Sequence, residues 1–209
     1  GVRPNIQLPK EIGVTIGVTG AVAVNNKMQT NIQDVYAVGD VAESFSVITG
    51  KPIYRPLGST ANKMGRIAGD VITGGNLEHR GVLGTGIFRV FDLHVGQTGM
   101  TEKEAKAADY SVEVLYNIKP DHAEYLGGKE LIIKALADKA TGRVLGAQVL
   151  GSQGVDKRID VLATAITFKA KAEDLFHLDL AYAPPFATTK DPIHYTGMAL
   201  DNALHGNPL

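Results

Sequence analysis

Apolar and polar residues alternate with a period of two in several segments of the second half of the chain. The alternation is clearest in "YSVEVLYN" (110–117), and "KELIIKALAD" (129–138) and "GRVLGAQVLG" (142–151) carry comparable apolar runs bounded by turn residues. Such segments are typical of β-strands. We predict strands at these three places, the last two joined as a hairpin at Gly142. "GIFRVFDLHVGQTG" (86–99) is predicted to form a further pair of strands.

The segment "STANKMGRIAGDVITGG" (59–75) carries the period of an α-helix instead. Ser59 can cap its first turn, and Gly74 and Gly75 end it. The predicted buried stripe of this helix consists of Ala61, Met64, Ile67, Ala68, Val71 and Ile72.

Three more helices are predicted in the second half of the chain. The longest covers 154–171, and its apolar face consists of Ile159, Leu162, Ala163 and Ile166. A short helix is predicted at 100–109, where Thr101 and Glu104 have the spacing of a capping box, and another at 172–178.

The first eighty residues contain fewer periodic segments. Val22 and Val24, between glycine breaks, predict a hairpin, and the run 35–38 (Val-Tyr-Ala-Val) predicts a buried strand. An alternating α/β pattern thus precedes residue 80, and several strands followed by helices come after it. We predict an α+β protein with a domain boundary near residue 80.

The predicted strand at 35–38 ends in Gly39 and Asp40. Ligands of open α/β sheets bind beyond the carboxyl ends of strands. Gly39 permits the close approach of a ligand or another backbone segment, and Asp40 offers a fixed acceptor for sugar-like hydroxyls. The N-terminus of the helix at Ser59 would favour an electron-rich oxygen. The same residues also fit a simple turn and a simple helix cap, and the local pattern alone favours that interpretation.

Composition excludes several classes of function. The 209 residues carry a net charge of −1, so we expect no bulk attraction to nucleic acid or to anionic membranes. No apolar run approaches the roughly 20 residues of a membrane span, and we expect a cytoplasmic protein without a signal peptide. The chain has no cysteine and only 6 scattered histidines. This excludes disulfides and a cysteine nucleophile within the chain and argues against a metal site.

The segment "TNIQDVYAVGD" (30–40) resembles the second flavin motif of the FAD-dependent pyridine nucleotide-disulfide oxidoreductases, T-x-x-x-x-(I/V)-Y-A-x-G-D. The similarity continues in the family's order through "GSTANKMGRIAGDVI", "GTGIFRVFDLHVGQTGMTEKEA" and "ATGRVLGAQVLGSQGVDKRIDVLATAI". The ending "YAPPFATTKDP" is similar to that of the coenzyme A-disulfide reductase and NADH oxidase branch. The resemblance implies that 1–80 form the second segment of an FAD-binding domain. It implies that 81–209 form the dimerisation domain of FAD/NAD-linked reductases, an antiparallel sheet plus helices.

The resemblance also implies a flavin site. Its residues would be Thr30, Gly39, Asp40, Ser59, Thr60, Ala61 and Asn62. The Asp40 carboxylate would accept a hydrogen bond from a ribityl hydroxyl, and the helix N-terminus would lie near the electron-rich pyrimidine edge of the isoalloxazine.

Three further residues acquire roles in the same way. Tyr125 and Tyr182 match tyrosines that coenzyme A-disulfide reductases extend across the dimer into the partner's active site. A neutral phenol can donate a hydrogen bond to a thiolate or disulfide sulfur. Lys190 matches a coenzyme A-contacting lysine, which can pair with a phosphate. The implied activity is electron transfer from NAD(P)H through FAD to a disulfide or persulfide of coenzyme A, in a homodimer.

The chain departs from the family's pattern in two respects. Tyr125-Leu126-Gly127-Gly128 stands where the family often has Y-Y-P-G. The family's G-x-G-x-x-G, its redox cysteine and its second Gly-rich fold are not found, and "GVLGTG" (81–86) has the wrong glycine spacing and leads into a strand. We therefore expect the C-terminal portion of a larger flavoenzyme, without turnover of its own. The alternatives are an NADH oxidase of the same family and a non-catalytic dimerisation module.

Other polar residues receive no functional role. The charges at 156–158 (Asp-Lys-Arg) are interpreted as a cluster at the start of a helix, with no ligand. The six histidines, including His94, His122 and His194, are expected to be surface or loop residues rather than catalytic bases.

Overall fold

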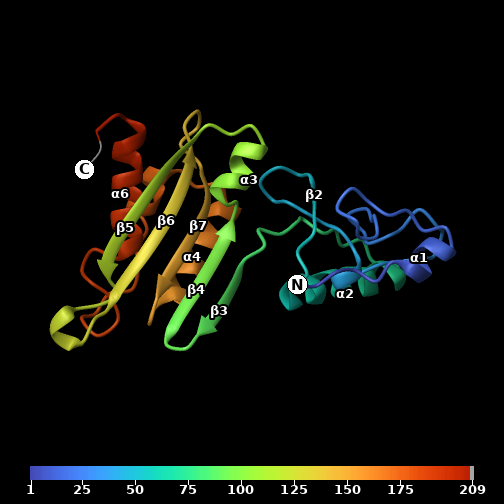
Figure 1. Ribbon diagram of the computed structural model, residues 1–209, viewed down its shortest axis with the longest axis horizontal. Helices are drawn as coiled ribbons and strands as arrows, with labels where there is room; N and C mark the ends of the chain where they lie inside the picture. The colour runs from blue at the N-terminus through green and yellow to red at the C-terminus, as the bar shows by residue number, and fades with distance from the viewer. Residues whose placement is uncertain (208–209) are drawn as a thin grey trace. The chain divides into compact units, whose positions relative to one another are not determined.

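The computed structural model describes residues 1–207 of the chain. The chain divides into a first unit, Gly1–Gly84, and a second unit that begins at Thr85; each is described by itself (Figure 1). The first unit contains α1 (Gln7–Glu11), the 3₁₀-helix η1 (Gly39–Val41), β1 (Ser44–Phe45), β2 (Pro52–Ile53) and α2 (Gly58–Ile72). The second contains β3 (Gly86–Val90), β4 (Leu93–Gly99), α3 (Glu102–Ala107), β5 (Val112–Pro120), the 3₁₀-helix η2 (Glu124–Leu126), β6 (Glu130–Asp138), β7 (Val144–Gly151), α4 (Val155–Thr167), α5 (Ala172–Phe176) and α6 (Pro192–Leu204).

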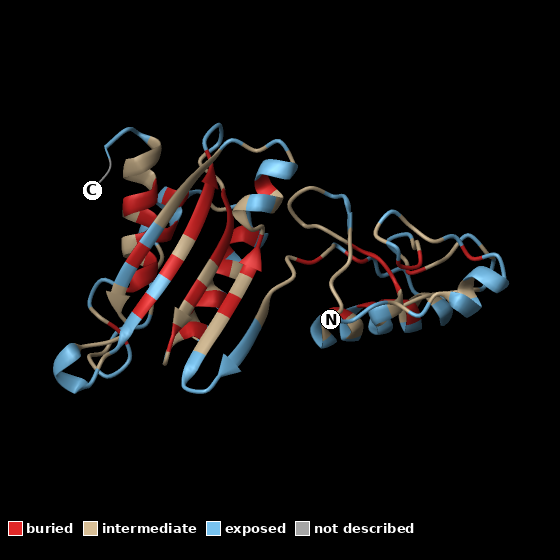
Figure 2. Cartoon of the chain, viewed as in Figure 1, coloured by how far each residue is buried: buried red, intermediate tan, exposed pale blue. Residues whose placement is uncertain are grey.

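The second unit is built on a five-stranded antiparallel sheet in the order β3-β4-β7-β6-β5. All of the predicted strands between 86 and 151 are confirmed, as is the hairpin at Gly142, whose φ of 72° only glycine adopts without strain. α4 packs on β4 and β7, and α6 packs on β5 and β6. Buried residues concentrate on the central strands β6 and β7 and on the helices that cover them (Figure 2).

The helices of the second unit follow their local signals, with one exception. α4 buries Ile159, Leu162 and Ile166, as predicted. The capping box of α3 is present, because Thr101 Oγ1 accepts from the Glu104 backbone N–H while the Glu104 carboxylate accepts from the Thr101 N–H. α5 forms at the predicted place. The exception is α6, a helix of 13 residues that was not predicted.

The first unit is organised around α2. Met64, Ile67 and Ala68 are buried against a small apolar cluster that includes Met28 and Ala42. The helix begins at Gly58, so the prediction that Ser59 caps it is wrong: Leu57 occupies the cap position and no side chain hydrogen-bonds there. The predicted stripe is too wide at its end, since the Ile72 side chain is 60% exposed.

The predicted strand at 35–38 is also wrong. Tyr36 forms a single antiparallel bridge with Gln29, and the Ala37 N–H donates to the Met28 carbonyl at 3.1 Å, but no strand forms. The predicted hairpin at 22–24 is likewise reduced to one bridge, Ile16 to Val22. A strand needs a neighbour along its length to satisfy its backbone hydrogen-bonding groups, and this run has only these few bonds; its residues 36–38 pack their side chains on the α2 cluster.

Among the described residues, 1–207, no helix has the length and apolar character needed to cross a bilayer.

Candidate functional site

In the first unit, Gly39 brings the predicted motif residues to the start of α2. Gly39 has a φ of 73°, in the left-handed region. A Cβ at this position would lie 3.4 Å from the Cβ of Ala61, in the first turn of α2. Glycine adopts this left-handed conformation without strain, and a Cβ here would reach van der Waals contact with the first turn of α2, so η1 lies directly against the helix. Gly39, Asp40 and the 59–62 segment, distant in the sequence, form one local site.

The N-terminus of α2 has no side-chain cap. The backbone N–H groups of its first turn therefore keep no side-chain acceptor. Ser59 and Asn62 are exposed while Thr60 is buried against the core. Unpaired N–H groups and the helix dipole together favour a negatively charged or electron-rich group. The Asp40 side chain is exposed beside this site and can accept hydroxyl donors.

Two residues around this site differ from expectation. The Thr30 hydroxyl donates to the Val35 carbonyl at 2.9 Å, so it closes its own turn. Tyr54 was not predicted to take part, yet its hydroxyl donates to the Asp40 backbone carbonyl at 2.9 Å. Burial, and then the charge of Asp40, raise the pKa of Tyr54. Tyr54 thus stays a neutral donor that fixes the backbone next to Asp40.

In the second unit, Tyr125 and Tyr182 lie on two irregular loops. Tyr125 is in η2, between β5 and β6, and 80% of it is exposed. Tyr182 is in the segment between α5 and α6, and 51% of it is exposed. The two loops touch directly, since the Ala123 N–H donates to the Pro184 carbonyl at 3.3 Å. Both phenols are therefore presented to the outside of the unit by neighbouring pieces of backbone.

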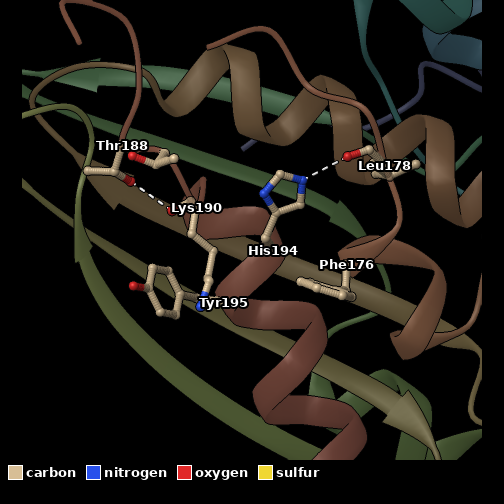
Figure 3. Close-up of a pocket in the computed structure, with 7 residues that line it drawn as sticks. Phe176, Leu178, Thr188, Lys190, His194 and Tyr195 are labelled. Atoms are coloured by element: carbon tan, nitrogen blue, oxygen red, sulfur yellow. Dashed lines mark hydrogen bonds between the residues drawn. The ribbon is translucent and has the colours of Figure 1, made fainter. Parts of the chain in front are cut away.

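Lys190 lies at a pocket of about 540 Å³ next to α6 (Figure 3). The pocket is lined by Phe176, Leu178, Thr188, Thr189, Lys190, His194 and Tyr195. The Lys190 ammonium lies 5.1 Å from the centroid of the Tyr195 ring, a cation–π distance. Neither Tyr125 nor Tyr182 is among the lining residues, so the structure places the predicted lysine in a hollow of its own.

The histidines expected to be surface or loop residues are partly integrated into the fold. His94 belongs to β4 and His194 to α6. His194 Nδ1 accepts from the Asp191 N–H at 3.2 Å, and its Nε2 lies 2.8 Å from the Leu178 carbonyl. His79 is buried and its Nε2 is 2.8 Å from the Ser44 hydroxyl. Among residues 1–207, no group of three or more His, Asp or Glu side chains is arranged to hold a metal ion.

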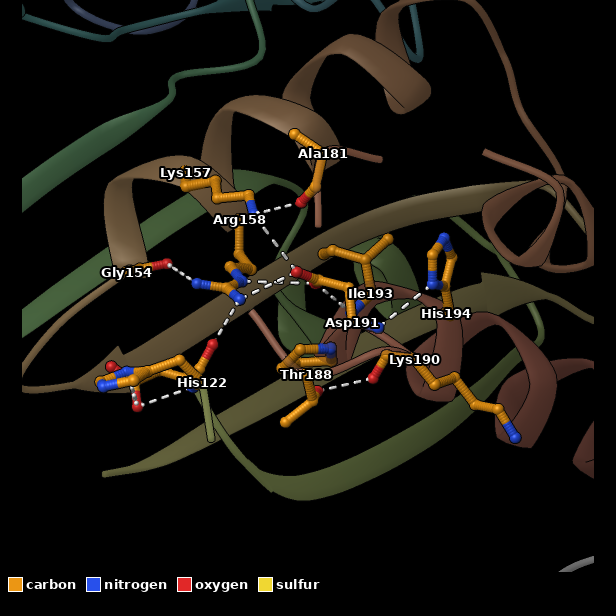
Figure 4. A network of polar contacts seen from close by, with 12 residues as sticks. His122, Gly154, Lys157, Arg158, Ala181, Thr188, Lys190, Asp191, Ile193 and His194 are labelled. Atoms are coloured by element: carbon orange, nitrogen blue, oxygen red, sulfur yellow. Dashed lines mark hydrogen bonds and ion pairs between the residues drawn. The ribbon is translucent and has the colours of Figure 1, made fainter. Parts of the chain in front are cut away.

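The charges at 156–158 are more than a surface cluster, because Arg158 is only 1% exposed. Its guanidinium contacts Asp191 through Nε at 3.3 Å and through Nη2 at 2.8 Å (Figure 4). The sequence contains a signal for this: Arg158 lies on the same helical face as the apolar Val155, Ile159 and Leu162. A charge on an apolar face requires a buried partner.

The chain is similar to known oxidoreductases over nearly its whole length. Residues 86–192 match the family described as pyridine nucleotide-disulphide oxidoreductase, dimerisation domain, and residues 1–65 match the pyridine nucleotide-disulphide oxidoreductase family. An NAD(P)H sulfur oxidoreductase (CoA-dependent) of Pyrococcus furiosus is 47% identical over 92% of this chain and 44% of the relative. An NADH oxidase of Methanocaldococcus jannaschii is 37% identical over 98% of this chain and 45% of the relative.

A solved structure, an NAD-dependent persulfide reductase from A. fulgidus, superposes with a TM-score of 0.95 at 40% identity. That alignment covers 99% of this chain and 39% of the solved one. The chain thus spans less than half the length of these proteins. The antiparallel sheet with its covering helices and the two matched segments agree, and the chain belongs to the pyridine nucleotide-disulphide oxidoreductase family.

Proposed function

We propose that this chain is the C-terminal part of an FAD-dependent NAD(P)H:disulfide oxidoreductase that reduces coenzyme A disulfide or persulfide. In this proposal residues 1–80 complete the FAD-binding domain and residues 81–209 form the dimerisation domain of a cytoplasmic homodimer. The observation that carries the proposal is the local site in the first unit, where Gly39 brings Asp40 to the uncapped N-terminus of α2. The names of the similar proteins support a sulfur acceptor and a coenzyme A requirement.

The residues of the first unit fit a flavin. The Asp40 carboxylate is exposed and would accept from a ribityl hydroxyl, while the first-turn N–H groups of α2 would face the pyrimidine edge. Bound FAD would supply two-electron transfer between NAD(P)H and sulfur. The helix end would stabilise negative charge that develops beside it, and Tyr54 would hold the Asp40 backbone in place. Thr30 would contribute only by shaping the turn that precedes the motif.

The residues of the second unit fit a role in a partner's active site. Tyr125 and Tyr182 are exposed, so their hydroxyls are free to reach a second subunit. The chain contains no cysteine, so the sulfur that is reduced must belong to a substrate or to another part of the protein. A phenol donating to that sulfur would stabilise a developing thiolate. Lys190 would bind a phosphate of coenzyme A at its pocket.

The test uses the full-length protein, purified with its flavin, and coenzyme A disulfide as the acceptor. We expect NAD(P)H-dependent reduction that falls about 100-fold in Tyr182→Phe, the usual cost of losing one donor to a developing anion. Tyr116→Phe, at another exposed tyrosine of the same unit, should leave the rate unchanged. Asp40→Ala should lower the flavin content and leave the dimer, measured by light scattering, intact. A protein that binds no flavin, or that is a monomer at micromolar concentration, would overturn the proposal.

A second candidate function is an NADH oxidase, favoured by the 37% identity to the protein of that name. The same preparation separates the two activities, because an oxidase consumes oxygen with NADH when no disulfide is present. Oxygen consumption faster than disulfide reduction would favour this second function.

A further inference from the structure

Arg158 is the most deeply buried charged group in the described part of the second unit, and it lies between the two tyrosine loops. Besides the two contacts to Asp191, its Nη2 donates to the Asp121 backbone carbonyl at 2.8 Å. Its Nη1 donates to the Gly154 carbonyl at 3.3 Å. Gly154 has a φ of 67°, and a Cβ there would collide with the guanidinium. The start of α4 is thus shaped to admit this side chain.

One partner of Arg158 anchors the loop that carries Tyr125. Asp121 directly follows β5, and its carboxylate accepts from the backbone N–H groups of His122 at 3.0 Å and Lys129 at 2.6 Å. These bonds close the 121–129 loop at its base. The Asp121 carbonyl that Arg158 holds therefore belongs to the residue that fixes both ends of this loop.

The other partner anchors the loop that carries Tyr182. Asp191 ends this loop and caps α6, because its Oδ1 accepts from the Ile193 N–H at 3.0 Å. Lys157, the residue before Arg158 in α4, also binds this loop. Its ammonium lies 3.5 Å from Asp191 Oδ2 and donates to the Ala181 carbonyl at 3.4 Å. Ala181 is the residue before Tyr182.

We propose that Arg158 is a positioning residue that holds the Tyr125 and Tyr182 loops as one rigid pair. The inference rests on the proposed role of the two tyrosines and names the group that fixes their relative position. Arg158 touches neither phenol; it acts through Asp121 and Asp191, and the Ala123 to Pro184 hydrogen bond joins the loops a second time. Figure 4 shows the contacts of Gly154 and Asp191 converging on the guanidinium of Arg158.

The chemistry of arginine suits this role better than that of any other residue. Its planar fork donates in several fixed directions, whereas a lysine ammonium is a compact charge on a flexible stem. A buried ion pair is often no more stabilising than an apolar pair of similar volume. The buried pair of Arg158 and Asp191 therefore contributes more to fixing the positions of the two loops than to the free energy of unfolding.

The experiment measures the full-length flavoenzyme in two variants. Arg158→Lys keeps the charge but loses the fork, and Arg158→Met with Asp191→Asn removes both charges while Asn can still cap α6. We expect both to lower kcat for coenzyme A disulfide by roughly 10- to 100-fold, the scale of a misplacement of about 1 Å. Flavin content and the anaerobic reduction of the flavin by NAD(P)H, which need neither loop, should stay at the wild-type level. Arg143→Lys, at a half-buried arginine away from both loops, is the matched control and should leave kcat unchanged.

The same variants are then placed in a Tyr125→Phe, Tyr182→Phe background. A residue that acts through the tyrosines should cost no further activity there, so the effects should be strongly non-additive. Additive losses, or a wild-type kcat in both Arg158 variants, would overturn the inference. If the double tyrosine variant is itself fully active, the proposed role of the tyrosines fails first, and the inference fails with it.

Discussion

The two units offer their proposed site residues in opposite ways. In the first unit the site consists mainly of backbone: a left-handed glycine, the N–H groups of an uncapped helix and a carbonyl held by Tyr54. In the second unit the site consists of side chains on exposed loops, and the backbone of these loops is held by the buried Arg158 and Asp191. The difference matches the proposed ligands, since a large cofactor can be bound by main-chain groups whereas a single sulfur atom requires one well-placed donor.

The units also differ in how the hydrogen-bonding groups of their backbones are paired. The second unit pairs its strands in continuous ladders of up to nine residues on β5 and β6. The first unit has a two-stranded sheet of two-residue strands and several isolated bridges. A unit with so little pairing of its own depends on α2 and its small cluster for stability. This contrast can be tested by substitution, from the largest expected effect to the smallest.

The largest effect is expected for Arg158→Met in the second unit. Removing one partner of a buried ion pair leaves the Asp191 charge buried, with Lys157 at 3.5 Å as its remaining ion-pair partner among residues 1–207. This should lower the free energy of unfolding by about 3–5 kcal/mol. Urea unfolding measures the loss. The paired variant Arg158→Met, Asp191→Asn should recover most of it; a single variant that costs less than about 1 kcal/mol would contradict the buried pair.

Core truncations compare the packing of the two units directly. Leu162 in α4 and Met64 in α2 are both fully buried. Each truncation to alanine should cost between about 2 and 5 kcal/mol, with Met64→Ala at the lower end because its half-buried neighbours can collapse into the space. Urea unfolding with probes in each unit gives both values. A larger cost for Met64→Ala would mean that the first unit is the more tightly packed.

Gly39→Ala tests the left-handed backbone at this position of the first unit. The left-handed conformation should cost about 1–2 kcal/mol in an alanine, while the new Cβ would only reach van der Waals contact with Ala61. Flavin affinity should fall as well, as measured by titration of the apoprotein. Gly65→Ala is the matched control: it lies inside α2 with no neighbour within 4 Å, so it should stabilise by about 0.5–1 kcal/mol.

Thr101→Ala removes a local signal in the second unit. The loss of one side-chain cap should cost about 1 kcal/mol, and Thr101→Ser should cost much less because the hydroxyl remains. Thermal unfolding resolves the difference. Equal losses in both variants would show that the methyl group, and not the hydroxyl, stabilises α3.

The smallest effect is expected for the loss of folding stability at acid pH. Burial, and then the charge of Lys63, lower the pKa of His79 in the first unit. The unfolded chain therefore takes up this proton first, and stability should fall as the pH drops below about 6.5. In the second unit, hydrogen bonds from Lys106 and then Lys134 lower the pKa of Glu102 to about 2. Its contribution is present above the unfolded pKa near 4.5 and is lost only as the pH falls toward 2.

Hydrogen exchange as a function of pH should therefore show protection in the first unit declining at milder acid than in the second. His79→Gln should remove this early decline. A decline that persists in that variant would assign it to another group.

The sequence predicts best where the signal is local. Thr101 and Glu104 are three residues apart, and the β6–β7 hairpin turns at Gly142, so neighbouring residues determine both. The segment at 35–38 has the composition of a strand, but a strand forms only with partners elsewhere in the chain, and here the pairing stops at one bridge, Tyr36 to Gln29. α6 was missed although Asp191-Pro192 is a strong start signal, because its buried positions include polar and small residues such as Thr196 and Gly197.

The candidate site follows the same division. The motif that ends in Gly39 and Asp40 could be found in the sequence, and the structure adds the reason for the glycine, which is its left-handed backbone. Tyr54 and Arg158 could not be assigned in the same way, because their partners are distant: Asp191 lies 33 residues from Arg158. The apolar face around Arg158 predicts that it is buried but not which carboxylate it meets.

The pocket beside α6 has a property that follows from the two contacts of His194. The Asp191 N–H can only donate and the Leu178 carbonyl can only accept, so the ring must be the neutral tautomer with its proton on Nε2. With its lone pair and its proton both engaged in these two hydrogen bonds, this imidazole serves to hold the Asp191 and Leu178 backbones together. In the proposed function, the pocket next to Lys190 would therefore bind part of a molecule, and the bond-making steps would take place at the flavin and the sulfur.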